Sequence, residues 1–308
     1  MSNGSILRDE AALAVAIGTL TAVAFGAGGF FLVNDNYGAM GSVLFLLLPF
    51  ATGFATALVS HGKKLIAAAL LIGLIICTAL LLATGHEGWV CVLMSMPLIV
   101  IGLTIGAIFG VIIRRHIIDK GQKPRVATLF LLLVIPFFLM GANHAEEGSR
   151  RTPRSQTVQN RLAVNAPPEV VWNQLKSLDQ VSGHKGLLMT IGSPVPVRCT
   201  MEGDGVGAKR TCYFESGHIE ERVTEWNPPN LMRFEITDFD VPGRPWLSFK
   251  DASYELRQEN GQTVIVRTTT IISRLSPAFY WRPLEKLGVE TEHEYLFEEL
   301  RRRLDGVK

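Results

Sequence analysis

The chain changes character abruptly between residues 126 and 154. Residues 126–142 (VATLFLLLVIPFFLMGA) carry no charge, and a run of this kind is typical of a membrane-spanning helix. Residues 143–154 then include His144, two glutamates and three arginines, with no apolar face to bury. We therefore predict a transmembrane helical domain at residues 1–143, a linker at 144–157 and a soluble domain at 158–308.

Charge follows the same division. Residues 1–144 contain eight Lys or Arg and five Asp or Glu, whereas the rest of the chain contains 22 and 23. The soluble part is nearly neutral, so its charge gives no case for nucleic-acid binding. Four cysteines are too few for a disulfide scaffold or a paired CxxC zinc site. The apolar run after residue 10 is too long for the core of a cleavable signal peptide, so we interpret it as an anchor.

Five apolar segments are each close to the roughly 20 residues that a helix needs to cross a bilayer. They are Ala11–Val33, Ala39–Ser60, Leu65–Thr84, Trp89–Ile113 and Val126–Ala142. A backbone in lipid must satisfy its own hydrogen bonds, so we predict an all-α bundle of five helices. Their interiors hold no Asp, Glu, Lys, Arg or His, which argues against a transporter or pump. The spacing of Gly102, Gly106 and Gly110 favours close packing within the bundle over a dimer interface.

The basic residues of the connecting loops predict an orientation. Two lysines lie between the second and third segments and five basic residues lie at 114–125, whereas the loops at 34–38 and 85–88 have none. By the positive-inside rule the N-terminus is cytoplasmic and the soluble domain is extracytoplasmic. The three arginines at 150–154 count weakly against this orientation.

The soluble part has the pattern of an antiparallel sheet. A strand at Val158–Val164 and a short helix from Pro168 precede a stretch, 179–196, with no clear pattern. Six further strands are predicted at Val197–Gly203, Gly207–Phe214, Ile219–Trp226, Leu231–Phe239, Phe249–Gln258 and Gln262–Ser273, separated by turn residues. Asn260-Gly261 is the strongest turn signal, because both residues tolerate the positive φ of a type I′ turn.

A long amphipathic helix closes the chain. Ser276 and Pro277 form a plausible start, and a stripe of mostly apolar residues follows at Val289, His293, Leu296, Leu300 and Leu304. The stripe needs an apolar partner, and the sheet is the one available. We therefore predict an α+β domain in which this helix lies across the concave face of the sheet.

This order of elements resembles the SRPBCC superfamily, which has the helix-grip fold of START lipid-transfer domains, birch-pollen allergens and polyketide cyclases. The resemblance rests on VNAPPEVVW (residues 164–172), EGDGVGAKRTCYF (202–214), IEERVTEWNPPNLMRFEI (219–236) and the terminal helix. It covers the last half of the chain and none of the membrane part. Pro167 departs from the small polar cap that is more usual there, which affects how the helix begins.

The resemblance implies a cavity between sheet and helix that binds an apolar ligand. Strand alternation and the helical stripe then provide pocket candidates, although each could equally be ordinary core. They are Met232, Phe234, Ile236, Tyr254, Leu256, Tyr280, Leu284, His293 and Leu296.

Polar residues on the same faces suggest chemistry, each with a simpler alternative. His293 could be a general base or a polar anchor, or a satisfied core residue. Glu221 could be a buried acid–base group, or with Glu225 a solvated charge at a sheet edge. Glu290 and His293 form an isolated ExxH pair, so we predict no metal and no cofactor.

We also predict a disulfide between Cys199 and Cys212. A type II′ turn at Gly205-Val206 would place these residues opposite each other and Glu202 opposite Lys209. A type I′ turn at Asp204-Gly205 would instead place Cys199 opposite Arg210. The bond requires the oxidising side of the membrane, and two unpaired thiols in a cytoplasmic sheet are the alternative.

Three functions fit these features. The first is a membrane-anchored domain that binds a lipid or another hydrophobic small molecule at the outer face of the cytoplasmic membrane. The second is an enzyme resembling polyketide cyclases or dehydratases, with His293 or Glu221 moving protons. The third is an interaction or sensory module with a vestigial cavity. The expected partners are the bilayer and the apolar ligand.

Overall fold

The computed structural model describes residues 3–33, 41–83, 89–120, 124–150, 152–176, 178–241 and 247–305. The chain forms two compact units, Met1–Thr152 and Pro153–Lys308, and each is described by itself. The predicted loops at 34–38 and 85–88, the segment ends at 39–40 and 84, and the predicted turn at 242–245 lie outside the described residues.

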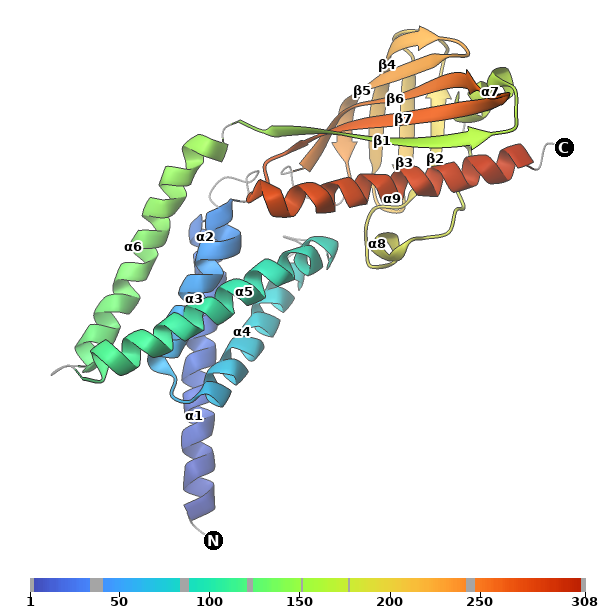
Figure 1. Ribbon diagram of the computed structural model, residues 1–308. Coiled ribbons are helices and arrows are strands. Elements are labelled where there is room, and N and C mark those ends of the chain that lie inside the picture. The colour runs from blue at the N-terminus through green and yellow to red at the C-terminus, as the bar shows by residue number, and fades with distance from the viewer. Residues whose placement is uncertain are drawn as a thin grey trace. The chain divides into compact units, whose positions relative to one another are not determined.

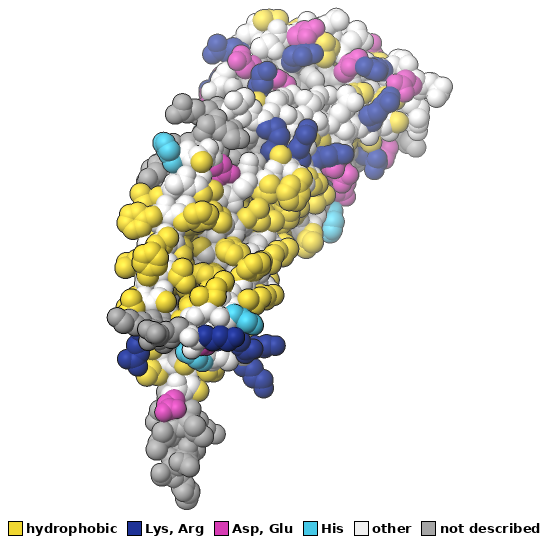
Figure 2. All heavy atoms as spheres, turned by 60° about the vertical axis from the view of Figure 1, so that its left-hand side comes forward, with side chains coloured by type: hydrophobic (Ala, Val, Ile, Leu, Met, Phe, Trp, Pro, Cys, Tyr) yellow, Lys and Arg dark blue, Asp and Glu magenta, His cyan; other side chains and the backbone are white. Residues whose placement is uncertain are grey.

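The described part of the first unit is helical (Figure 1). Its helices are α1 (Asn3–Val23), α2 (Gly29–Val33), α3 (Leu48–Val59), α4 (Lys63–Ala83), α5 (Trp89–Ile113) and α6 (Pro124–Arg150), with π-helical stretches at Ala24–Gly28, Val43–Leu47 and Arg114–Ile118. Four stretches are long and apolar enough to cross a membrane, namely Glu10–Phe31, Lys63–Ala83, Trp89–Ile118 and Arg125–Glu146. Large apolar side chains are exposed along them and form the yellow band of Figure 2, as expected of a membrane protein.

The second predicted span differs from the other four. Its described apolar helix, Val43–Val59, is shorter than those four stretches. Most of α3 is buried against its neighbours. A Cβ added to Gly106 of α5 would lie 1.9 Å from the backbone oxygen of Phe50, so the two helices are in backbone contact. The small-residue stripe of α5 therefore serves packing inside the bundle, as predicted.

Charged side chains cap both ends of the helix Val43–Val59, which we call the interior helix. At its start, the Glu146 carboxylate accepts the backbone N–H groups of Ser42 at 2.5 Å and Val43 at 3.1 Å. At its end, Arg114 donates to the carbonyl oxygens of Ala57, at 2.6 Å, and Ser60. An acid at the N-terminus and a cation at the C-terminus complement the helix dipole and satisfy its end groups.

The polar segment at 144–157 contains more regular structure than the predicted linker. Helix α6 continues to Arg150, and strand β1 begins at Arg154. The helix extends because Glu146 finds backbone partners at the start of the interior helix. The strand begins early because Arg154 forms an ion pair with buried Glu285, 2.6 Å away.

The second unit is a seven-stranded antiparallel sheet with α9 lying along it (Figure 1). Its elements are β1 (Arg154–Val164), α7 (Pro168–Lys176), α8 (Leu187–Thr190), β2 (Pro196–Glu202), β3 (Lys209–Phe214), β4 (His218–Asn227), β5 (Leu231–Asp240), β6 (Leu247–Glu259), β7 (Gln262–Ser273) and α9 (Ala278–Asp305). The strand order is β1-β7-β6-β5-β4-β3-β2. This arrangement confirms the predicted α+β helix-grip class.

The two predicted turns had different outcomes. Asn260 and Gly261 have φ of 52° and 79° and join Glu259 to its partner Gln262, which is the predicted type I′ turn. The type II′ turn predicted at Gly205-Val206 is wrong.

The turn before β3 lies one residue later than predicted, with Val206 and Gly207 at its central positions. The N–H of Ala208 donates to the carbonyl of Gly205 at 3.2 Å. Gly207, with φ of 90°, therefore occupies the second central position, as in a type II turn. The predicted pairing of Glu202 with Lys209 nevertheless holds, because the strand ladder sets it.

Candidate functional site

Five of the predicted pocket residues meet in one buried cluster between the sheet and α9. These are Met232 and Phe234 of β5, Tyr254 and Leu256 of β6, and Leu296 of α9. The other apolar candidates, Ile236, Tyr280 and Leu284, are half-buried and lie outside this cluster.

His293 is fully buried and both ring nitrogens are occupied. Nδ1 lies 2.7 Å from Oδ1 of Asn160, and Nε2 lies 2.8 Å from Oγ1 of Thr269. Burial, together with the charge of Arg267, lowers the pKa of His293 to about 2. The imidazole is therefore neutral, which matches a satisfied core residue better than a general base.

The ExxH pair does not assemble a metal site. Glu290 forms an ion pair with Lys286 at 3.4 Å, while His293 is held as just described. Among the residues that the structure describes, no three His, Cys, Asp or Glu side chains are grouped so as to hold a metal ion.

Two ion pairs that sequence reasoning missed lie inside the domain. Arg210 of β3 donates to Glu221 of β4 at 2.6 Å, and Arg267 of β7 donates to Glu292 of α9 at 2.9 Å. Both arginine side chains are at least nine-tenths buried. Reading Glu221 as a solvated edge charge was therefore wrong, because β4 is an interior strand and its partner is also inside.

Tyr254 links the two ion pairs. Its ring centroid lies 5.8 Å from the guanidinium carbon of Arg210 and 5.2 Å from that of Arg267. Arg210 also lies over the ring of Phe234, at 4.9 Å. These contacts hold both cations against aromatic faces in the interior.

Several buried donors of this group have no acceptor among the described residues. They are Nε and Nη2 of Arg210, Nε and Nη1 of Arg267, and the hydroxyl of Tyr254. Buried donors are normally paired, and an unpaired one costs about 1–3 kcal/mol. We refer to Arg210, Glu221, Tyr254, Arg267 and Glu292 as the open cluster.

The members of the open cluster influence one another electrostatically. Burial alone would lower the pKa of Arg210, but the Glu221 carboxylate and then Tyr254 outweigh it and raise that pKa. Burial raises the pKa of Glu292, Arg267 opposes this shift and Glu221 adds to it. The two ion pairs therefore act as one charged group.

Strand alternation contained a signal for these residues. Arg267 alternates with Ile265, Thr269 and Ile271, all of which are buried on the inner face. Arg210 likewise alternates with Cys212.

Helix α9 holds two buried carboxylates, each seven residues from the half-buried Glu292. Glu285 accepts from Arg154 and from Ser273 of β7. Glu299 accepts from Ser182, Arg302 and Arg303.

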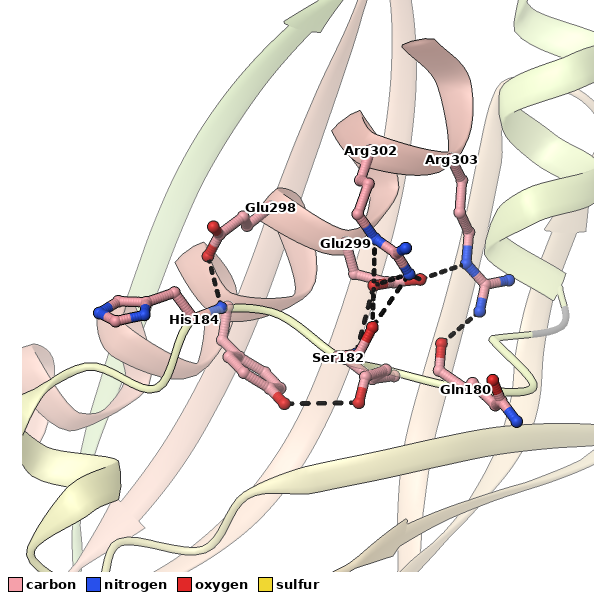
Figure 3. A network of polar contacts seen from close by, with 9 residues as sticks. Gln180, Ser182, His184, Glu298, Glu299, Arg302 and Arg303 are labelled. Carbon is pink, nitrogen blue, oxygen red and sulfur yellow. Dashed lines mark hydrogen bonds and ion pairs between the residues drawn. The ribbon is translucent and has the colours of Figure 1, made fainter. Parts of the chain in front are cut away.

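Figure 3 shows Glu299 among these partners. Its neighbour Glu298 contacts only the backbone N–H of His184, at 2.9 Å, among the interactions drawn there. The segment from Gln180 to His184, which had no clear sequence pattern, is therefore held on the end of α9 by these contacts.

A disulfide joins the two strands at the far edge of the sheet. Cys199 of β2 and Cys212 of β3 are register partners, and their sulfur atoms are bonded. Both side chains belong to the buried cluster.

Comparisons with known proteins concern the second unit. No curated protein matches the chain. Among solved structures, the Aha1 dimer from Colwellia psychrerythraea has 16% identity, covers 47% of this chain and 96% of its own, and has a TM-score of 0.30. The ZhuI aromatase/cyclase from Streptomyces sp. R1128 has 14% identity, 49% and 96% coverage, and a TM-score of 0.33. Norcoclaurine synthase from Thalictrum flavum, in complex with dopamine and hydroxybenzaldehyde, has 14% identity, 48% and 87% coverage, and a TM-score of 0.31.

A protein-family model matches residues 155–308, which is half of the chain. The matched region begins at the second residue of β1 and includes the sheet, the open cluster and α9. The sequence resemblance to the SRPBCC superfamily is thereby confirmed, and the chain belongs to the polyketide cyclase/dehydrase and lipid transport family.

Proposed function

We propose that this protein is a membrane-anchored binding module whose C-terminal domain takes up a lipid or another apolar small molecule between its sheet and α9. The observation that carries the proposal is that donors of Arg210, Arg267 and Tyr254 lack acceptors among the described residues, beside the apolar cluster between the sheet and α9. A bound molecule with acceptor atoms would satisfy these donors, while its apolar part would suit the surrounding side chains.

We further propose that the domain lies at the outer face of the cytoplasmic membrane. The interior helix supports a fifth crossing, because it contacts Glu146 at the end of one membrane-length stretch and Arg114 near the end of another. Five crossings put the two ends of the chain on opposite sides. The basic loops then favour a cytoplasmic N-terminus, and the disulfide suits an oxidising compartment.

Mass spectrometry of molecules extracted from the purified full-length protein tests the binding proposal. We expect an apolar molecule to co-purify with the protein. An Ala252→Trp substitution, on the buried face of β6, should displace it, whereas Ser253→Trp on the opposite face should not. Tryptophan fluorescence would verify that both variants remain folded.

Two results would contradict the proposal. One is the absence of any co-purifying molecule from the folded protein, which would favour an interaction module. The other is an equal loss of the molecule from both tryptophan variants.

Thiol labelling of intact cells tests the location. In a Cys77→Ser/Cys91→Ser background, an impermeant maleimide should label Cys199 and Cys212 only after an impermeant reductant is added. Labelling that needs permeabilised cells but no reductant would place the domain in the cytoplasm.

A further inference from the structure

We infer that the ligand carries an anionic head group with two acceptor oxygens, a carboxylate or a phosphate, and that Arg210 binds this group inside the domain. The inference rests on the proposed function and adds the chemistry of the ligand's polar end.

The unused nitrogens of Arg210 form one edge of its guanidinium. Nη1 is taken by Glu221 at 2.6 Å, whereas Nε and Nη2 have no partner among the described residues. The N–H groups of Nε and Nη2 point in parallel and match two oxygens of one carboxylate or phosphate. A ligand with a single hydroxyl would leave one of them unpaired.

The guanidinium of Arg210 is held in place before any ligand arrives. Its side chain is 3% exposed, bonded to Glu221 and placed over the ring of Phe234 at 4.9 Å. An arginine that is already oriented loses little conformational entropy on binding. The free edge is therefore a preformed recognition element.

Further donors lie around Tyr254, the ring that Arg210 also contacts at 5.8 Å. Arg267 lies 5.2 Å from the centroid of this ring, and two of its nitrogens and the Tyr254 hydroxyl have no partner in the described part of the chain. An arginine side chain only donates hydrogen bonds, so the group that satisfies these nitrogens must be an acceptor. An anion accepts more strongly than a neutral carbonyl or ether oxygen.

The charge of the open cluster can adjust to an anion. Two arginines and two glutamates balance each other before binding. Glu292 is 22% exposed, and burial raises its pKa, so this carboxyl can take up a proton when a second anion approaches.

Ligand binding to the full-length protein in nanodiscs of zwitterionic lipid tests the inference, with empty nanodiscs subtracted. The probes are radiolabelled dodecanoate, dodecyl phosphate and the neutral dodecanol. We expect one of the two anions to bind at least tenfold more tightly than dodecanol, and the tighter anion identifies the head group.

Two arginine variants provide the matched comparison. Arg210→Lys keeps the charge beside Glu221 but removes the two-nitrogen edge, so anion affinity should fall at least tenfold, whereas dodecanol, which uses only one of the two nitrogens, should lose much less affinity. Arg257→Lys, at an exposed pair with Glu255 on β6, should change neither.

The outcomes separate this inference from the proposed function. Equal binding of anions and dodecanol, or an equal effect of Arg210→Lys on both, would overturn the inference and leave apolar binding intact. Failure of all three probes to bind overturns the inference, whereas the proposed function is tested separately, by the molecule that co-purifies with the protein and by the two tryptophan variants.

Discussion

Glu285, Glu292 and Glu299 of α9 are equally spaced in sequence but end in different surroundings. At the end of the helix, Glu299 is enclosed by Ser182, Arg302 and Arg303. In the middle, Glu292 has Arg267 as its hydrogen-bond partner, and two nitrogens of that arginine are unused among the described residues. A satisfied polar network rigidifies a domain, whereas a partly satisfied one costs stability unless a ligand completes it.

The difference assigns separate tasks to regions of one helix. Glu285, bonded to Arg154 and Ser273, and Glu299 attach α9 to β1, to β7 and to the segment before α8. Beside the middle of α9, Arg267 of β7 keeps two donor nitrogens without an acceptor among the described residues. Stability and binding can therefore be changed independently, which the following substitutions test.

The largest change in the free energy of unfolding is expected at Glu299, near the C-terminal end of α9. Glu299→Gln should lower the free energy of unfolding by about 3 kcal/mol, because the buried carboxylate accepts from three side chains and an amide, with one oxygen and a donor NH2 group, cannot replace all of these bonds. Glu298→Gln is the matched control and should cost under about 1 kcal/mol, since that side chain is exposed. Urea unfolding of the full-length protein, followed by tryptophan fluorescence, measures both. Similar losses in the two variants would show that Glu299 does not hold α9.

A smaller effect is expected from the neutral histidine beside the open cluster. The folded-state pKa of His293 is lowered to about 2, so its contribution is present above the unfolded value of about 6.5 and is lost as the pH falls. At pH 5 the loss is about 2 kcal/mol relative to pH 7.5. Glu292 contributes in the opposite direction, because its pKa is raised.

The His293→Gln variant isolates the contribution of His293 to the pH dependence of the free energy of unfolding, because Glu292 and Arg267 are present in both proteins. The difference in unfolding free energy between the variant and the parent should shrink by about 2 kcal/mol between pH 7.5 and pH 5. A difference that does not vary with pH would mean that His293 is protonated in the folded protein.

The smallest changes in the free energy of unfolding are expected at two tyrosines, and the two changes have opposite signs. Tyr254→Phe removes an unpaired buried hydroxyl and should raise the free energy of unfolding of the ligand-free protein by about 1 kcal/mol. Tyr295→Phe removes a hydroxyl that donates to the Val181 carbonyl at 3.4 Å and should lower it slightly. Destabilisation by Tyr254→Phe would indicate that its hydroxyl is satisfied in the protein.

Local patterns determined most of the secondary structure. Strands alternate with period two and the turns hold Gly, Asn and Pro, so the bounds from β2 to β7 lie within about two residues of those predicted. The apolar runs likewise predicted the helices of the first unit. These features depend on neighbours in the chain, which is why sequence alone sufficed.

The partners of the polar residues depended on the tertiary structure. The register of two adjacent strands brings Arg210 opposite Glu221, but only the packing of α9 on the sheet brings Glu292 to Arg267. Asn160 and His293 meet across 133 positions of sequence. Helical periodicity shows which face of α9 is buried but not which strand residue each side chain meets. The sequence by itself thus determined most of the helices and strands, whereas packing decided which donors are paired and which have no acceptor among the described residues.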